Sequence, residues 1–311
     1  MSLLLKSLLF WICICTLAMG APNQITSKIL AGQDVNLTLP WMAGLYVSQT
    51  NSQCQHADDC YDNFKFSCAA ALINQQWLVT AAHCVSFHTQ TLDSRAVQLF
   101  LGEVSLNDVI SYQSVEQIIV HEQYGNSEDY KFDIALLKLT NSVLYQPIDI
   151  INDGKESLIN PGTPMLLAGW GRSIQDGFYY YPDQLQMTQL EFVDSKVCQE
   201  IFLPFTELDS AQLCAGGDGV HDACDGDSGG PLIVNIAGRW KLVGLVSFGV
   251  QVCALSGYPS VFTRLSQYSD WIKEQGVPAN ESTLGGFQVI WLCLLLLMLS
   301  LKLMALIRCK L

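Results

Sequence analysis

Short apolar-rich runs, each ended by Gly, Asn, Asp or Pro, make up most of the chain after residue 28. Few stretches show a long helical periodicity. Runs of this kind at regular spacing indicate β-strands of an all-β sandwich or barrel. The strands predicted are Trp41–Val47, Trp77–Thr80, Ala96–Leu101, Gln117–Val120, Ile134–Leu139, Met165–Ala168, Trp240–Ser247 and Ser260–Thr263.

One short helix is predicted near the end of this region. Residues Tyr268–Gln275 carry apolar Trp271 and Ile272 among polar residues. Gly276 and Pro278 follow directly and supply the usual stop signals.

The first 20 residues differ from the strand-forming region. Met1–Gly20 carries a positive Lys6, then an apolar stretch, then the small-x-small sequence Ala18-Met19-Gly20. This order is typical of a signal peptide, and an uncleaved anchor is the alternative interpretation. The rest of the chain would then enter the secretory pathway.

The C-terminal tail is apolar over residues 287–307, a length that can cross a bilayer. A linker, 277–286, precedes it. Arg308 and Lys310 follow, as the positive-inside rule prefers for a short cytosolic end, 308–311. We favour a transmembrane helix here, and a GPI-anchor signal is the alternative, because small residues precede the apolar stretch.

Charge and cysteine content narrow the class of protein. The chain has 29 Asp and Glu against 16 Lys and Arg and no basic cluster, so it lacks the charge that nucleic-acid binding requires.

Of the 12 cysteines, eight lie between Cys54 and Cys253. An even number behind a signal peptide predicts disulfides formed in an oxidising compartment. For Cys54 and Cys60, with His56 and two aspartates between them, a small disulfide loop is preferred to a metal site.

Three motifs carry the candidate chemistry. They are Thr80-Ala81-Ala82-His83-Cys84, Asp133-Ile134-Ala135-Leu136-Leu137 and Gly226-Asp227-Ser228-Gly229-Gly230-Pro231. In this order, His then Asp then Ser, they resemble the trypsin-like serine proteases of the chymotrypsin fold. The resemblance extends over Ile29 to Gln275 and implies a catalytic domain over 29–276. The implied fold is all-β, with two six-stranded antiparallel Greek-key barrels, a short C-terminal helix and, beyond it, the hydrophobic anchor.

The resemblance also implies roles for individual residues. His83 would be the base that activates the Ser228 nucleophile, and Asp133 would orient His83. The backbone N–H groups of Gly226 and Ser228 would form an oxyanion hole.

A specificity pocket follows from the same resemblance. Asp222 would lie at its base and select Arg or Lys in the substrate. Residues Ser247-Phe248-Gly249 would pair with the substrate backbone. Ser260 stands where trypsin has Gly, so its side chain is expected to narrow the pocket or to hydrogen-bond Asp222.

The family pattern further implies disulfides and an activation step. The pairs would be Cys68 with Cys84, Cys198 with Cys214, and Cys224 with Cys253, which leaves Cys54 with Cys60. Another family bridge is replaced on both sides, by Met165 and Val234.

Cleavage after Lys28 would remove a propeptide, 21–28, and free an Ile29 ammonium to pair with Asp227. The propeptide has no cysteine, so it would not stay attached through a disulfide. Asn36 and Asn280 lie in possible glycosylation sequons.

No cofactor is expected, and no metal, because the acidic set that calcium-binding relatives carry after Glu103 is missing. The expected partners are protein or peptide substrates with Arg or Lys, an activating trypsin-like protease, serine protease inhibitors and a membrane, with the catalytic domain extracellular or lumenal. The competing hypothesis is a protease-fold binding or adhesion module with little turnover.

Overall fold

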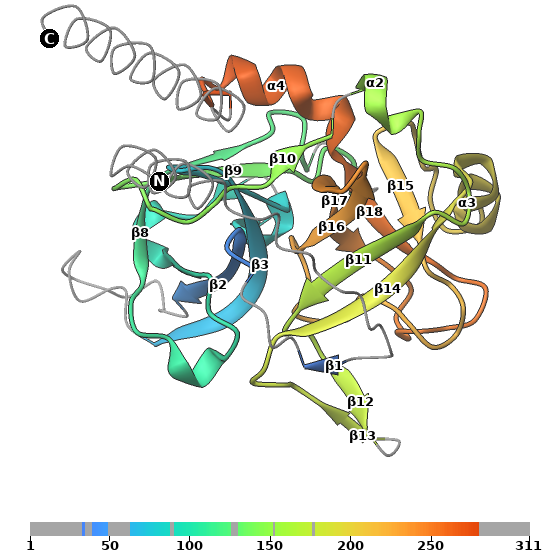
Figure 1. The fold of residues 1–311 in the computed structure, drawn as a ribbon, viewed down its shortest axis with the longest axis horizontal. Helices are drawn as coiled ribbons and strands as arrows, with labels where there is room; N and C mark the ends of the chain where they lie inside the picture. The colour runs from blue at the N-terminus through green and yellow to red at the C-terminus, as the bar shows by residue number, and fades with distance from the viewer. Residues whose placement is uncertain are drawn as a thin grey trace, which may run out of the picture. The chain divides into compact units, whose positions relative to one another are not determined.

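Two antiparallel β-barrels form the framework of the part of the chain that the structure describes (Figure 1). The structure is a computed structural model, and it describes residues 33–34, 39–48, 63–87, 90–125, 130–151, 153–175 and 178–279. All of these belong to one unit, Ile29–Ala279. Several predictions lie outside the described residues: the signal peptide, the propeptide with Lys28 and Ile29, Cys54 and Cys60, Asn36, Asn280, and the anchor over 287–307.

The first barrel is closed and has six strands in the order β2-β3-β4-β9-β8-β7. Their bounds are β2 Met42–Ser48, β3 Phe64–Asn74, β4 Trp77–Thr80, β7 Val97–Leu101, β8 Gln113–Val120 and β9 Ala135–Leu139. Every pairing in it is antiparallel. Strand β4 ends at the turn that carries His83, and β9 begins just after Asp133, so this barrel places both residues at neighbouring strand ends.

The second barrel contains six antiparallel strands in the order β14-β11-β16-β17-β18-β15, and a β14–β15 pairing closes it. The bounds are β11 Pro164–Gly169, β14 Gln186–Val193, β15 Gln212–Ala215, β16 Pro231–Ile236, β17 Arg239–Phe248 and β18 Ser260–Arg264. Two short strands extend this sheet: β1, Gln33–Asp34, beside β14, and β10, Asp149–Ile150, parallel to β17. The loop with Ser228 leads directly into β16.

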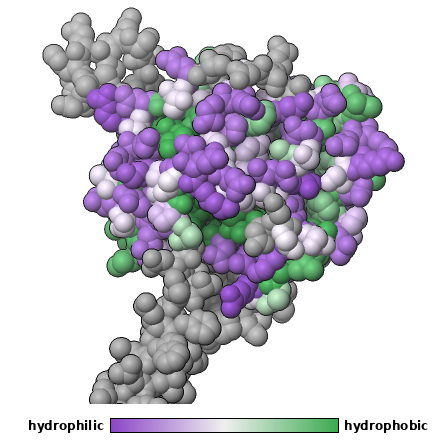
Figure 2. All heavy atoms as spheres, turned by 90° about the horizontal axis from the view of Figure 1, so that it is seen from above, coloured by the Kyte–Doolittle hydropathy of each residue, from purple (hydrophilic) through white to green (hydrophobic). Residues whose placement is uncertain are grey.

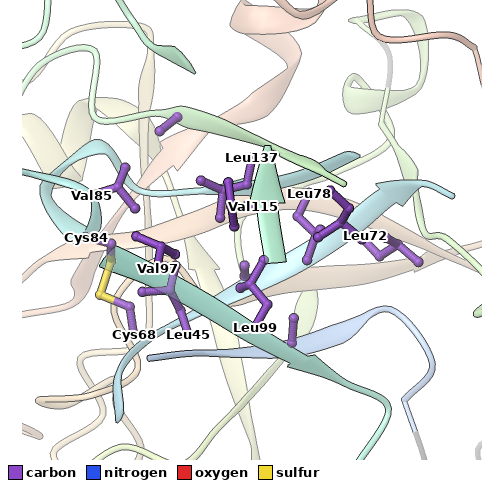
Figure 3. Close-up of a cluster of buried hydrophobic side chains, with 14 of the residues drawn as sticks. Leu45, Cys68, Leu72, Leu78, Cys84, Val85, Val97, Leu99, Val115 and Leu137 are labelled. Carbon is purple, nitrogen blue, oxygen red and sulfur yellow. A yellow bond between two sulfur atoms is a disulfide. The ribbon is translucent and has the colours of Figure 1, made fainter. Parts of the chain in front are cut away.

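Each barrel has its own apolar interior. In the first, alternate side chains of the strands meet, among them fully buried Leu45, Leu72, Leu78, Leu99 and Leu137 (Figure 3). Burying one such side chain stabilises the fold by about 1.5 to 3 kcal/mol. On the face seen in Figure 2, hydrophilic residues predominate and hydrophobic residues gather in separate areas. Successive residues of a strand point to opposite faces, and in β3 both faces are covered: Ala70 and Leu72 belong to the interior of the first barrel, whereas Ala71 and Ile73 belong to a second apolar cluster that also contains residues of the other barrel.

Short segments connect and flank the barrels. They are the strands β5 Ser86–Phe87, β6 Gln90–Thr91, β12 Ser173–Gln175 and β13 Phe178–Tyr180, the helices α2 Asp153–Glu156, α3 Ser195–Phe202 and α4 Ser269–Glu274, and four 3₁₀ turns at Ala82–Cys84, Ser94–Ala96, Leu106–Asp108 and Leu265–Tyr268. Helix α3 starts where the Asp194 carboxylate accepts hydrogen bonds from the N–H groups of Lys196 and Val197, at 2.9 and 3.3 Å.

All eight predicted strands are present, with ends shifted by a few residues. The predicted helix Tyr268–Gln275 is found as a 3₁₀ turn that passes into α4 at Ser269. Strands β3, β14, β15 and β16 and helix α3 were not predicted. Within the described part of the chain, no helix has the length and apolarity needed to cross a membrane.

Three disulfides cross-link the described residues, and they join the expected pairs: Cys68 to Cys84, Cys198 to Cys214, and Cys224 to Cys253. At the position of the missing family bridge, Met165 on β11 lies directly opposite Val234 on β16. Both side chains are buried, with exposures of 0% and 1%. An apolar contact therefore occupies this position in the core of the second barrel.

Candidate active site

His83 and Asp133 form a bonded pair at the edge of the first barrel. The Nδ1 atom of His83 lies 2.8 Å from Oδ2 of Asp133, and the backbone N–H of His83 donates to Oδ1 at 2.9 Å. With an ionised carboxylate, this contact places the proton of a neutral imidazole on Nδ1. The Nε2 atom is then left as the basic nitrogen.

The second barrel contributes to the same carboxylate. The Ser247 hydroxyl, near the end of β17, donates to Oδ2 of Asp133 at 2.6 Å. The Thr263 hydroxyl on β18 donates to the backbone carbonyl of Asp133 at 2.7 Å. Asp133 has no exposed surface, and a buried carboxylate is tolerated only when its oxygens are bonded in this way.

The charges in this pair stabilise each other. Burial by itself would raise the pKa of Asp133, but the charge and hydrogen bond of His83, with the Ser247 hydroxyl, hold that pKa below its usual value. Burial would likewise lower the pKa of His83, and the Asp133 carboxylate instead raises it. The pair can therefore hold a proton on the imidazole when one is delivered to Nε2.

The Ser228 loop is bonded through its backbone to β3 and β17, and Gly229 lies close to Thr80 at the end of β4. The Ser228 carbonyl accepts a hydrogen bond from the N–H of Ala69 on β3 at 2.8 Å, and the N–H of Gly229 donates to the carbonyl of Val246 at 2.8 Å. Gly229 has a φ of 72°, and a Cβ there would lie 2.1 Å from Oγ1 of Thr80 and 2.6 Å from the carbonyl oxygen of Ala69. Ser228, which is half-buried, is thus fixed beside the segment that leads to His83.

The close approach at Gly229 can be measured with a matched glycine. Gly238 has a similar φ of 81° but nothing within 4 Å of an added Cβ. Replacing either residue with Ala costs the same backbone strain, so the difference between the two variants isolates the contact. We expect Gly229→Ala to lower the free energy of unfolding by about 2 to 3 kcal/mol more than Gly238→Ala, because the loop must move away from β3 and Thr80. Equal losses in urea unfolding would contradict this packing.

Arg172 fixes the residue that precedes Gly226. Its backbone N–H donates to the Asp225 carbonyl at 2.7 Å, and its guanidinium lies 3.0 Å from the Asp225 carboxylate. Gly226 has a φ of 98°, and its N–H, like that of Ser228, donates to no other residue in the described ranges. Both N–H groups are thus available to bind an oxygen at the site.

Asp227 is a buried carboxylate with polar but uncharged partners among the described residues. It accepts hydrogen bonds from the N–H groups of Gly171 at 2.8 Å and Cys224 at 2.9 Å. Burial raises its pKa from 3.8 to about 6, with small contributions from Asp222 and Asp225. A cation placed here would reverse this shift.

Asp222 lies in the loop before Cys224, with its carboxylate oriented by three donors. Ser260 donates its hydroxyl to Oδ1, as the sequence led us to expect, and the N–H groups of Ala223 and Ala254 donate at 3.0 and 2.7 Å. Burial raises the pKa of Asp222, although these donors oppose the rise. Ser260 also lies near Gly249, since a Cβ on that glycine would be 3.7 Å from the Ser260 hydroxyl.

One group of possible metal-ligating atoms occurs among the described residues. The ligand atoms of Cys68, His83 and Cys84 lie within 4.8 Å of one another. The two sulfur atoms are joined in a disulfide, so they offer no thiolate to a metal.

The structure joins His83 to Asp133 and Ser260 to Asp222, and it adds contacts that the motifs did not indicate. Ser247 was assigned to substrate binding through its backbone, but its hydroxyl also supports Asp133. Thr263 and Arg172 were not singled out. Thr263 contacts a residue more than a hundred positions away in the chain, and Arg172 contacts one about fifty positions away. The sequence carries no local signal for such contacts.

Comparisons with known proteins agree with this geometry. Residues 31–272 match the protein family described as Trypsin. The chain is 37% identical to Trypsin II-P29 of Gallus gallus and 36% identical to Chymotrypsin-like elastase family member 1 of Macaca fascicularis, in each case over 67% of this chain and 78% of the relative. It is 34% identical to Transmembrane protease serine 11G of Mus musculus over 67% of this chain and 49% of that protein. With the two barrels and the bonded His83–Asp133 pair, these matches show that the chain belongs to the trypsin family and is a trypsin-like serine endopeptidase.

Proposed function

We propose that the protein hydrolyses peptide bonds after Arg or Lys through a triad of His83, Asp133 and Ser228. The observation that carries the proposal is the fully buried Asp133 carboxylate, bonded to Nδ1 of His83 and to Ser247. A fold kept only for binding has no need of a buried charge whose partners orient an imidazole, because burying that charge is costly.

The proposed reaction begins when Ser228 Oγ attacks the substrate carbonyl and transfers its proton to Nε2 of His83. The imidazolium that forms is stabilised by Asp133 and then gives the proton to the leaving amine. The carbonyl oxygen becomes an oxyanion, for which the N–H groups of Gly226 and Ser228 are the proposed donors. Water repeats the sequence to release the acyl group from Ser228.

A fluorophosphonate probe tests the nucleophile directly, because it labels a serine only when a base activates it. The full chain is treated briefly with trypsin, labelled, and compared with the Ser228→Ala variant. Labelling of the wild type alone supports the proposal. An unlabelled wild type, folded and cleaved, would favour the competing hypothesis of a binding module.

Basic specificity is proposed from Asp222 and not from the relatives, because a trypsin and a chymotrypsin-like elastase are similar to this chain at nearly equal identity. A buried carboxylate that meets an apolar substrate side chain is left without a counter-charge, whereas Lys or Arg supplies one. An ionised carboxylate has about four acceptor positions. Three donors already occupy Asp222, so a single ammonium fits the remaining space better than a two-pronged guanidinium.

Ser260 is therefore expected to limit turnover and to disfavour Arg relative to Lys. We predict that Ser260→Gly raises kcat/KM several-fold, and more on Arg than on Lys substrates, because it frees one acceptor position and space near Gly249. Ser260→Ala removes the hydroxyl but keeps the Cβ. Comparing it with Ser260→Gly therefore separates the effect of the hydrogen bond on kcat/KM from the effect of side-chain size. Asp222→Ser should remove most of the activity on both substrates, by at least about tenfold.

A substrate library read out by mass spectrometry measures all of these variants together. Unchanged kcat/KM in Ser260→Gly would show that the hydroxyl does not restrict the pocket. A wild-type profile dominated by aromatic or small residues before the scissile bond would rule out basic specificity.

We further propose that residues 287–307 attach the enzyme to a membrane, with the catalytic domain on the extracellular or lumenal side. The apolar tail and the positive residues after it support this. One relative, Transmembrane protease serine 11G, is named for membrane attachment.

A further inference from the structure

The backbone just before Asp133 adopts an unusual conformation. Tyr130 and Phe132 have positive φ angles of 49° and 59°. Bulky aromatic residues seldom occupy this left-handed region, because the Cβ approaches the backbone closely there. The Ile134 N–H donates to the Phe132 carbonyl at 2.8 Å, so the chain turns sharply around Asp133. Strained backbone of this kind persists only where the surrounding structure holds it.

His121 holds this turn on both sides of Asp133. The rings of His121 and Phe132 are stacked, with centroids 4.9 Å apart and planes 20° from parallel. The backbone N–H of His121 donates to the Ile134 carbonyl at 3.1 Å. His121 thus contacts the residue before Asp133 through its ring and the residue after it through its backbone.

The stacking partner is itself fixed. The His121 ring packs against Trp271 of α4 at 5.0 Å and against Tyr268 at 5.6 Å. Its Nδ1 atom accepts a hydrogen bond from the Gln123 N–H at 3.2 Å. The ring therefore has little freedom to follow Phe132 if that residue moves.

Tyr130 is held from the second barrel. Its ring is stacked on Phe248 at 5.2 Å and lies edge-on to His83 at 6.4 Å. Phe248 follows Ser247, whose hydroxyl is bonded to Asp133. The two strained residues are thus held by different rings, Phe132 by His121 and Tyr130 by Phe248.

We propose that Phe132 is a positioning residue for Asp133, whose stacking on His121 maintains the left-handed turn that directs the Asp133 carboxylate to Nδ1 of His83. This inference rests on the proposed triad. Phe132 is only half-buried, and an Asn at this position would adopt the left-handed conformation more readily without any ring. The ring stack compensates for the cost of placing an aromatic residue in the left-handed conformation. It also fixes the position of the backbone from which the Asp133 side chain extends.

The test uses the full-length chain after cleavage and compares Phe132→Ala, Phe132→Leu and Phe132→Tyr. Loss of the ring lets the turn relax and Asp133 withdraw, so Phe132→Ala should lower kcat at least about tenfold with KM within about twofold of wild type. Because Asp133 raises the pKa of His83, its withdrawal should move the acidic limb of the kcat/KM profile to lower pH. Phe132→Tyr keeps the stack and should restore both values.

Control variants distinguish a loss of positioning by Phe132 from a loss of folding and from a failure of the proposed activity. Phe132→Leu keeps the apolar bulk without the ring, and it replaces the Ala variant if that variant does not fold. Phe178→Ala changes an exposed aromatic residue on β13 and should leave kcat unchanged. A folded Ala or Leu variant with wild-type kcat and an unshifted acidic limb overturns the positioning role. An inactive wild type would instead count against the proposed function.

Discussion

Replacing Ser228 with Ala in the cleaved protein is expected to lower kcat by about 10⁴- to 10⁶-fold while the fold is retained. The hydroxyl is the proposed nucleophile, and without it only the binding groups and the oxyanion donors remain to assist water. The loop itself should not change, because its contacts with Ala69 and Val246 are made by the backbone. Hydrolysis of a peptide substrate with Lys or Arg before the scissile bond measures the loss.

His83→Ala provides the partner experiment. His83 and Ser228 are proposed to act in the same proton transfer, so their losses should not add. The double variant should be at most about tenfold slower than the more impaired single variant. Thermal unfolding of each variant, with the three disulfides intact, checks that the site alone has changed. Turnover near the wild-type level in Ser228→Ala would mean that another group is the nucleophile.

The candidate site was largely readable from the sequence because its groups lie in short, dense motifs. A glycine-rich turn around Ser228 and a His beside a cysteine are local patterns, and an apolar strand that begins just after Asp133 is another. The support around Asp133 was not readable in the same way. The Ser247 and Thr263 hydroxyls reach it only because β17 and β18 of the second barrel come against the first barrel.

The fold shows the same division between local and long-range information. Strands such as β4 and β18, whose residues are almost all buried, form clear apolar runs. Strand β14 was missed because most of its positions are partly exposed and carry Gln, Thr and Glu, which hide the alternation. Helix α3 is short and begins at Ser195, so the Asp194 cap before it was its main local signal. The left-handed conformation of Phe132 contradicts its propensity and depends on the His121 ring.

The second large effect is expected at Asp227. In the uncleaved chain, this residue should make folding stability fall as the pH rises, which is opposite to the effect of an ordinary salt-bridged carboxylate. Its pKa is raised from 3.8 to about 6 by burial, so the folded state binds this proton more tightly than the unfolded state does. The resulting stability is present below about pH 4 and is lost as the pH rises through about 6. A rise of about two pKa units corresponds to about 3 kcal/mol.

Cleavage after Lys28 is expected to reverse this dependence and to raise activity by roughly 10²- to 10⁴-fold. The new Ile29 ammonium would pair with Asp227, and a buried pair with one partner missing costs about 3 to 5 kcal/mol, which corresponds to that range of rates. Asp227 lies directly between Gly226 and Ser228 in the chain, so an ion pair there would fix both proposed oxyanion donors. Asp227 would then have a lowered pKa, and stability would be lost below about pH 4 and again as the ammonium loses its proton above about pH 8.

Urea unfolding of the inactive Ser228→Ala chain, before and after cleavage, at about pH 4 and about pH 7.5, measures this reversal without self-digestion. Between these two pH values the uncleaved chain should lose stability as the pH rises, whereas the cleaved chain should keep the stability of the pair, because Asp227 and the ammonium both stay charged. Adding Asp227→Asn should abolish this difference between the two forms, because the group that titrates is gone. In the otherwise wild-type chain, Asp227→Asn should keep activity low even after cleavage, and Lys28→Gln should prevent activation by trypsin. An active form whose first residue is not Ile29, or a cleaved Asp227→Asn variant with full activity, would show that the oxyanion donors are ordered by some other contact.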